Sequence, residues 1–196
     1  MIPNLLIPEF DPATHTYKVK GNSVDGVTII LRSTFGANPF WTQAGREAGQ
    51  AAHVAIHYYA QNDLDYDSLH ESVKPRLDAY IKFCADMNFK PDMIEQPLYR
   101  ESPLYCGTPD QVQTGRVIVD FKNGPVLPEV SLQLAGYAHM LPNPLLYERW
   151  GVNLDDNGTY SLKIFPKQEM TSDWVVFQSC LNTHNWRKRY ERSRTK

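Results

Sequence analysis

The chain has 196 residues, of which 42% are hydrophobic and 21% charged, and its formal net charge is −2. This composition is typical of a globular protein with a sizeable core and gives no overall sign of a nucleic-acid partner, and no apolar segment is long enough to span a membrane. The N-terminal apolar stretch is short, is broken by prolines and lacks a basic segment, so we expect no signal peptide and a cytoplasmic, intracellular protein.

The first predicted elements are a β-hairpin and two helices. Residues 15–33 alternate in polarity, are rich in β-branched residues and contain Gly21-Asn22, which predicts an N-terminal hairpin. Apolar residues at helical spacing predict a helix over 41–60. A second amphipathic helix is predicted over 68–88, on the condition that Pro75 lies in its first turn, where proline is tolerated.

The second half of the chain is predicted to supply most of a sheet. Three strands are expected over residues 93–100, 105–113 and 116–122. A helix follows over 128–140, then a strand pair over 145–165 around Asp156-Asn157-Gly158, and then a helix over 169–190. This order predicts an α/β (α+β) fold with one central mixed β-sheet flanked by helices, not a doubly wound nucleotide fold.

We expect a single domain over residues 1–196. Its parts are an N-terminal hairpin segment (1–37), a core (38–185) and a basic tail (186–196). The tail holds six basic residues and one Glu. A segment of this composition is either a solvated, fraying tail or an arm that contacts phosphates.

Two aspartates and a lysine surround one predicted turn. Asp120 directly follows the apolar run 117–119, where a carboxylate costs several kcal/mol unless it is paired or binds a cation. If Asp110 lies close by, the two carboxylates repel each other unless a cation lies between them, and such oxygen ligands suit Mg²⁺ or Mn²⁺. Lys122 shares a strand face with Asp120 and can stabilise charge that grows on a phosphate. These are the parts of metal-assisted phosphodiester hydrolysis.

The length of the loop between the two strands tests this interpretation. A two-residue turn at Thr114-Gly115 would point Asp120 away from Asp110, whereas a three-residue loop over 114–116 would place the two aspartates opposite each other. The simpler alternative is a turn aspartate after Pro109 and a surface ion pair between Asp120 and Lys122.

Four short motifs occur in order along the chain. They are Gly49-Gln50-Ala51-Ala52-His53, Gly107-Thr108-Pro109-Asp110, Asp120-Phe121-Lys122 and Gln133-Leu134-Ala135-Gly136-Tyr137. The set resembles the PD-(D/E)XK nuclease superfamily, specifically its RecB-type branch, which carries G-x-x-x-H, G-x-x-D, (D/E)-x-K and Q-x-x-x-Y. The resemblance covers most of the chain, from about Phe10 to Trp186, and it implies a restriction-endonuclease-like core.

The resemblance also implies a role for each matched residue. The implied ligands of a divalent metal, Mg²⁺ or Mn²⁺, are His53, Asp110, Asp120 and the backbone carbonyl of Phe121. Lys122 would position the attacking water and the scissile phosphate. Gln133 and Tyr137, one turn apart on a helix face, would orient Lys122 or contact the substrate. Glu95 matches a position where the family often has an acidic residue.

Some of these residues have simpler interpretations. A single histidine on an alanine-rich helix is often a core residue, and His57, one turn after His53, competes for the role of ligand. Gln133 and Tyr137 alone would pass as an ordinary helix face. The iron–sulfur members of the family need four cysteines, whereas this chain has three at other positions, so we expect no iron–sulfur cluster.

The function implied by the resemblance is that of a divalent-metal-dependent deoxyribonuclease, an exonuclease on single-stranded or open DNA ends in recombination, replication or repair. Its size suits a phage protein, acting in a bacterial or phage-infected cell. A structure-selective or restriction-type endonuclease and a non-catalytic DNA-end-binding recombination partner stay open. The implied substrate and partner is DNA. No helicase motif is present in the sequence, so any unwinding would come from a separate helicase, and a recombinase is a further partner that we consider. Four aromatic residues are available to stack unpaired bases: Phe40, Trp41, Tyr58 and Tyr59.

Overall fold

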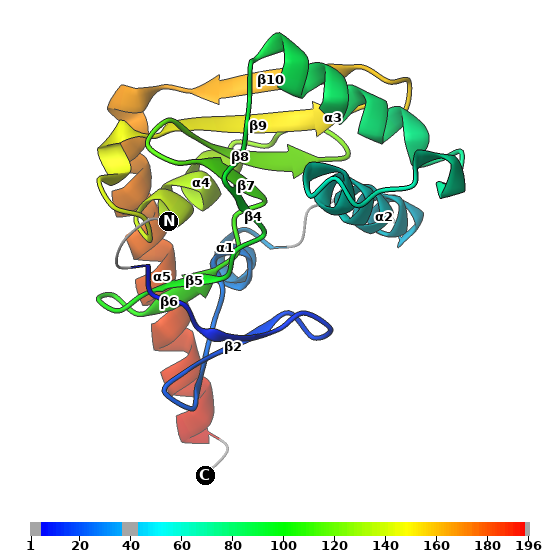
Figure 1. Ribbon diagram of the computed structural model, residues 1–196. Coiled ribbons are helices and arrows are strands. Elements are labelled where there is room, and N and C mark those ends of the chain that lie inside the picture. The colour runs from blue at the N-terminus through cyan, green and yellow to red at the C-terminus, as the bar shows by residue number, and fades with distance from the viewer. Residues whose placement is uncertain (1–4, 37–42, 195–196) are drawn as a thin grey trace.

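A five-stranded mixed sheet forms the centre of the protein. The computed structural model describes residues 5–36 and 43–194. The sheet has the order β10-β9-β8-β7-β4, in which only β8 and β9 are parallel. Its strands are β4 (Met93–Ile94), β7 (Gln111–Gln113), β8 (Val117–Lys122), β9 (Glu148–Leu154) and β10 (Tyr160–Phe165). Helices flank this sheet, as Figure 1 shows, so the predicted mixed sheet with flanking helices is confirmed.

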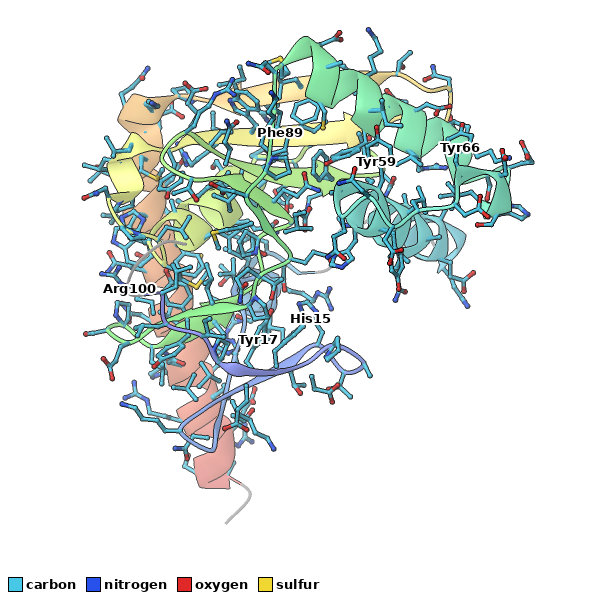
Figure 2. All side chains as sticks on the ribbon, viewed as in Figure 1. His15, Tyr17, Tyr59, Tyr66, Phe89 and Arg100 are labelled. Carbon is cyan, nitrogen blue, oxygen red and sulfur yellow. The ribbon has the colours of Figure 1, made fainter. Side chains whose placement is uncertain are left out.

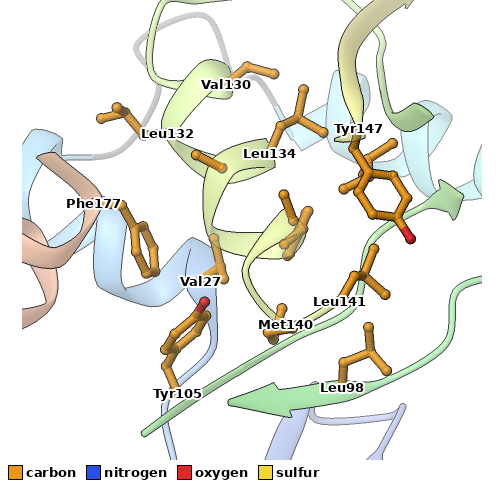
Figure 3. Packing of buried hydrophobic residues seen from close by; sticks show 14 of the residues in the cluster. Val27, Leu98, Tyr105, Val130, Leu132, Leu134, Met140, Leu141, Tyr147 and Phe177 are labelled. Carbon is orange, nitrogen blue, oxygen red and sulfur yellow. The ribbon is translucent and has the colours of Figure 1, made fainter. Parts of the chain in front are cut away.

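The side chains of the central strand β8 alternate between two hydrophobic clusters. Val117, Val119 and Phe121 pack in one cluster with α3 (Lys74–Asp86). Ile118 belongs to the other, which contains residues of α1 (Val27–Phe35), α4 (Val130–Ala138) and α5 (Met170–Arg194) and is drawn in part in Figure 3. Both faces of β8 are therefore covered, which explains its nearly continuous apolar sequence. Asp120, two residues after Ile118, faces the α4 side.

The N-terminal segment is only partly a hairpin. Three short antiparallel strands form a separate sheet: β1 (Glu9–Asp11), β2 (Thr16–Val19) and β3 (Asn22–Val24). The predicted extension of the hairpin to residue 33 is wrong, because residues 27–35 form α1. The β-branched residues of this stretch favour a strand locally. Val27, Ile30 and Leu31, however, lie at helical spacing and are buried in the core, and this burial outweighs the local preference.

Two helices follow this segment, as predicted. The helix α2 covers Gln43–Ala60 and ends where predicted, whereas its predicted start at residue 41 lies outside the described residues. The predicted start of the next helix at residue 68 is wrong, because α3 begins at Lys74. Pro75 lies in its first turn, as the prediction required. A short 3₁₀ helix (Tyr66–Ser68) lies ahead of it.

The two strands predicted over 93–100 and 105–113 are each split. Glu95 has a left-handed backbone with φ 45°, which ends β4, and the chain then forms β5 (Leu98–Arg100). That strand pairs with β6 (Tyr105–Gly107) in a two-stranded sheet of its own, whereas β4 pairs with β7. Pro109 lies in the gap between β6 and β7 and has no N–H for a strand ladder. The break leaves Asp110 directly before β7, at the end of the central sheet.

The loop between β7 and β8 has three residues. The strand register pairs Gln111 with Val119 and Gln113 with Val117, so the loop is 114–116, with Gly115 at φ 72°. Continuing this register by one residue places Asp110 opposite Asp120. The predicted odd-length loop is confirmed.

The remaining helices and strands lie close to their predicted positions. The helix α4 lies within the predicted range 128–140, and the hairpin of β9 and β10 turns at the predicted Asp156-Asn157-Gly158. Short 3₁₀ helices occur at Pro144–Leu146 and Lys167–Glu169. Most of the predicted basic tail is helical, because α5 continues to Arg194. No helix in the described part of the chain is both long enough and apolar enough to cross a membrane.

One buried arginine ties α4, β9 and α5 together. Arg149 on β9 is 0% exposed, donates hydrogen bonds to the carbonyls of Ser131 and Pro166, and pairs with Asp173 on α5. We predict that Arg149→Ala lowers the free energy of unfolding by about 3–5 kcal/mol, because Asp173 loses its partner. Urea denaturation measures the change.

Lys20→Ala is the matched control for this prediction. Lys20 pairs with Glu101 at the surface, where the two side chains are 74% and 63% exposed, so its loss should change the stability much less than the loss of Arg149 does. Equal losses for the two variants would contradict the assigned role of Arg149.

Candidate active site

One cleft of about 320 Å³ brings together most of the predicted site residues. The predicted residues that line it are His53, Asp110, Asp120, Phe121, Lys122, Gln133 and Tyr137. They come from α2, the segment before β7, the end of β8 and α4. Glu95 does not line this cleft. The site therefore forms where the carboxyl end of the central strand meets two helices.

The Asp120 carboxylate is buried at the base of this cleft. Its side chain is 1% exposed, and the Lys122 Nζ lies 2.6 Å from its Oδ2. This contact is a close ion pair between the carboxylate and the ammonium group. Burial raises the pKa of Asp120 to about 6, against the opposing effect of Lys122, and the charge of Asp110 adds to the rise. The alternative of a surface ion pair between Asp120 and Lys122 is therefore wrong.

Lys122 is the counter-charge of the two carboxylates. Burial alone would lower the pKa of its ammonium group, but the charges of Asp120 and Asp110 outweigh this effect and the net pKa is raised. Its side chain is 27% exposed, so it can be reached from solvent while Asp120 is not. Lys122 thus presents a positive charge at the cleft surface, backed by a buried negative charge.

Gln133 connects the acid, the lysine and the tyrosine. Its Nε2 donates to Asp120 Oδ1 at 2.6 Å and to the Tyr137 hydroxyl at 3.1 Å, and its Oε1 accepts from Lys122 Nζ at 3.4 Å. Burial raises the pKa of Tyr137 well above its ordinary value, so this phenol stays protonated. The i, i+4 spacing of Gln133 and Tyr137 on α4 places both side chains on the face that covers β8.

Asp110 is oriented by the central strand. Its Oδ2 accepts a hydrogen bond from the backbone N–H of Phe121 at 2.7 Å. Its own carbonyl accepts from the N–H of Glu95 at 2.9 Å. The first bond fixes the segment before β7 against β8, and the second joins it to the residue that follows β4. The Oδ1 of Asp110 lies 3.9 Å from His53 Nδ1.

The two histidines of α2 occupy different positions. His53 lines the main cleft, whereas His57 lines only a second, smaller cavity of about 10 Å³ together with Glu95. Glu95 Oε2 lies 3.1 Å from His57 Nδ1, and its Oε1 lies 4.0 Å from His53 Nδ1. His53 is thus the histidine that faces Asp110 and Lys122 in the cleft. Glu95 lies behind it, between the two imidazoles.

The glycines of two motifs sit where chain segments approach closely. A Cβ on Gly49 would lie 2.7 Å from the Asn123 Nδ2, and a Cβ on Gly107 would lie 2.7 Å from Cε1 of Tyr137. Real Cβ atoms do not come this close to other heavy atoms. Gly49 lets α2 lie against the end of β8, and Gly107 makes room for the ring that Gln133 contacts.

The cleft also contains residues that the sequence did not single out. His15, on the loop before β2, lines it together with Thr108. The Tyr17 hydroxyl lies 3.1 Å from His15 Nε2 and 2.9 Å from Thr108 Oγ1, so it contacts both of these lining residues; Figure 2 labels His15 and Tyr17. His15 and Tyr17 lie in the N-terminal stretch that resembles the family, but only the folded structure brings them to Asp110. The aromatic candidates Phe40 and Trp41 lie outside the described residues, and Tyr58 and Tyr59 do not line the cleft.

The donor atoms of the cleft fit a divalent cation, although they do not form a finished site. No three His, Cys, Asp or Glu side chains of the described segments make a ready metal-binding group. Two carboxylates and an imidazole nevertheless line one cleft, and one of the carboxylates, Asp120, is almost fully buried. Two ligands of one Mg²⁺, each about 2.1 Å away, are at most about 4.2 Å apart. The 3.9 Å between His53 Nδ1 and Asp110 Oδ1 lies within this limit.

A scan of protein-family models and a search of curated proteins found no match to this chain.

Metal binding can be measured without any assay of catalysis. We predict that Mn²⁺ raises the unfolding temperature of the wild-type protein, because a ligand that binds only the folded state stabilises it by about 2.7 kcal/mol at 100 times its Kd. The rise should be lost in Asp120→Asn and much reduced in His53→Gln. His57→Gln is the matched control and should keep it. A full rise in Asp120→Asn would show that the cation binds elsewhere.

Proposed function

We propose that the protein is a divalent-metal-dependent nuclease of the PD-(D/E)XK type that hydrolyses DNA phosphodiester bonds. The observation that carries this proposal is the convergence of Asp110, Asp120, Lys122 and His53 in one cleft. These residues belong to three separate parts of the chain. A buried carboxylate beside a second carboxylate and a lysine serves no evident purpose in stabilising the fold, because such groups are costly to desolvate.

The metal site would be built from residues that already line the cleft. His53, Asp110 and Asp120 would hold Mg²⁺ or Mn²⁺, and the backbone carbonyl of Phe121 would complete the protein ligands. A cation bound there lowers the pKa of a coordinated water and neutralises charge on the phosphate. Hard oxygen donors with one imidazole suit these two ions.

The remaining polar side chains would position the substrate and the nucleophile. The Lys122 ammonium can donate to a phosphate oxygen or hold the attacking water, and it stabilises negative charge that grows during the reaction. Gln133 accepts from Lys122 and donates to Asp120, so it keeps the lysine beside the acid. Tyr137 supports the amide of Gln133 from the same helix face.

The family resemblance favours an exonuclease on single-stranded or open DNA ends, in recombination, replication or repair, with a helicase or recombinase as a possible functional partner. End-labelled single- and double-stranded DNA, incubated with Mn²⁺ or with EDTA, tests the proposal. Metal-dependent degradation of linear DNA but not of circular single strands would support the exonuclease. Cleavage of the circles would make the protein an endonuclease. DNA binding without cleavage in Mn²⁺ would contradict the nuclease proposal and leave the end-binding module as the remaining function.

A substitution of Lys122 distinguishes catalysis from metal binding. We predict that Lys122→Ala lowers the rate of DNA cleavage by about 100-fold or more, the loss typical of removing one donor that stabilises transition-state charge. The stabilisation of this variant by Mn²⁺ should survive. Lys163→Ala, on the exposed edge strand β10, is the control and should cleave at the wild-type rate. A Lys122→Ala protein of undiminished activity would contradict the assigned role.

A further inference from the structure

The positive charge of the chain is concentrated at the end of α5. Residues 186–196 hold six of the 20 Lys and Arg residues and one of the 22 Asp and Glu residues. The preceding 185 residues therefore carry 14 basic and 21 acidic side chains. A polyanion is repelled on average by the rest of the protein and attracted by this segment, whose described residues continue α5 to Arg194.

The same helix turns carry a row of planar groups on one face. Trp186 and Tyr190 stack with ring centroids 5.6 Å apart and an interplanar angle of 13°, and the Arg194 guanidinium carbon lies 5.8 Å from the Tyr190 centroid. The spacing of four residues keeps all three on one side of the helix. Trp186 is 56% exposed and Tyr190 is 52% exposed. We call this row, Trp186, Tyr190 and Arg194, the aromatic ladder.

Other basic residues of the segment anchor the helix instead. Lys188 and the Nε2 of His184 both contact the carboxylate of Asp25, and Arg187 donates to the carbonyl of Ser33 on α1. These contacts hold the helix end against the start and the end of α1. Figure 1 shows the last turns of α5 extending beyond the central sheet. The aromatic ladder is thus presented on a helix that is fixed to the body of the protein.

Helix α1 connects the anchored helix end with the cleft. Ser33 of α1 accepts the hydrogen bond from Arg187, and Thr28, on the same helix, lines the cleft with Lys122 and Gln133. One helix, α1, therefore contacts both the end of α5 and the cleft.

We propose that the aromatic ladder binds the single-stranded part of a DNA substrate, with unpaired bases stacked on Trp186 and Tyr190 and phosphates beside the arginines. This inference rests on the proposed function, because it assigns a second contact to the same substrate. Aromatic faces on a positively charged surface are the combination that holds single strands without regard to sequence. A duplex hides its base faces and gains nothing from the rings.

The residue types on this part of α5 favour nucleic acid over a lipid surface. A membrane-binding helix buries a broad face of aromatic and aliphatic side chains. The exposed aliphatic residues of α5 are Val175 and Val176, nearly three turns before Trp186. Near the end of α5, the large exposed apolar groups are the two stacked rings alone, among the described residues.

Binding of fluorescently labelled oligo(dT) in EDTA tests the inference, because no cleavage occurs without metal. We expect Trp186→Ala/Tyr190→Ala to weaken binding about 10-fold or more, since one stacked base contributes about 1–3 kcal/mol. Trp186→Phe/Tyr190→Phe keeps both rings and should retain most of the affinity. Val175→Ala, an equally exposed position on the same helix, is the control and should bind as the wild type does.

The outcomes separate this inference from the proposed function. If the wild type binds oligo(dT) through the ladder but cleaves no DNA with Mn²⁺, the ladder is supported and the nuclease proposal fails. If the double alanine variant binds oligo(dT) as the wild type does, the ladder inference is overturned whether or not DNA is cleaved. If the wild type binds anionic phospholipid vesicles but not oligo(dT), and the double alanine variant does not bind the vesicles, the ladder binds a membrane and the inference is overturned. If sedimentation shows a dimer of the wild type that the double alanine variant does not form, and both bind oligo(dT) equally, the ladder binds a second copy of the chain and the inference is overturned.

Discussion

The structure depends on one buried charge pair, Asp120 with Lys122, at the end of the central strand. A carboxylate in this position is costly, and its nearest partner is a lysine that is itself partly desolvated. The surroundings compensate for that cost. Gln133 donates to the acid and accepts from the lysine, and α4, which carries Gln133, is buried along nearly its whole length. Asp110 adds a second negative charge instead of relieving the first. A fold selected for stability alone would place an apolar side chain at this position, so the charges point to chemistry.

The family resemblance implied most of the site residues, and short-range geometry predicted how some of them are placed. The parity of the loop 114–116 decides whether Asp110 and Asp120 face each other, and helical periodicity places Gln133 with Tyr137. The rest depends on tertiary structure. The stretch that became α1 is locally β-prone and is helical because of the core it joins. The strand break at Glu95 needs a left-handed residue that no local pattern indicated. The wall formed by His15 exists only once the N-terminal sheet has packed beside the cleft.

Under the two proposals, two differently charged surfaces would contact one polyanionic substrate. The cleft carries a buried and a half-buried carboxylate beside one lysine, and this net negative charge repels phosphate until a cation is bound. The helix end beyond residue 186 carries the surplus of positive charge and the exposed aromatic rings. The end of α5 would then attract the substrate and the cleft would cleave it, and α1 contacts both. The arrangement also accounts for the unremarkable net charge of −2, which hides a strongly uneven distribution.

Diffraction from crystals soaked in Mn²⁺, with data collected for the anomalous signal of manganese, tests the central claim most directly. The account predicts a peak in the cleft, bound by the carboxylates of Asp110 and Asp120 and by His53. It also predicts that the Lys122 ammonium no longer holds the Asp120 oxygen that the ion takes. A cleft without a peak at saturating Mn²⁺, or a peak bound only by other residues, would contradict it.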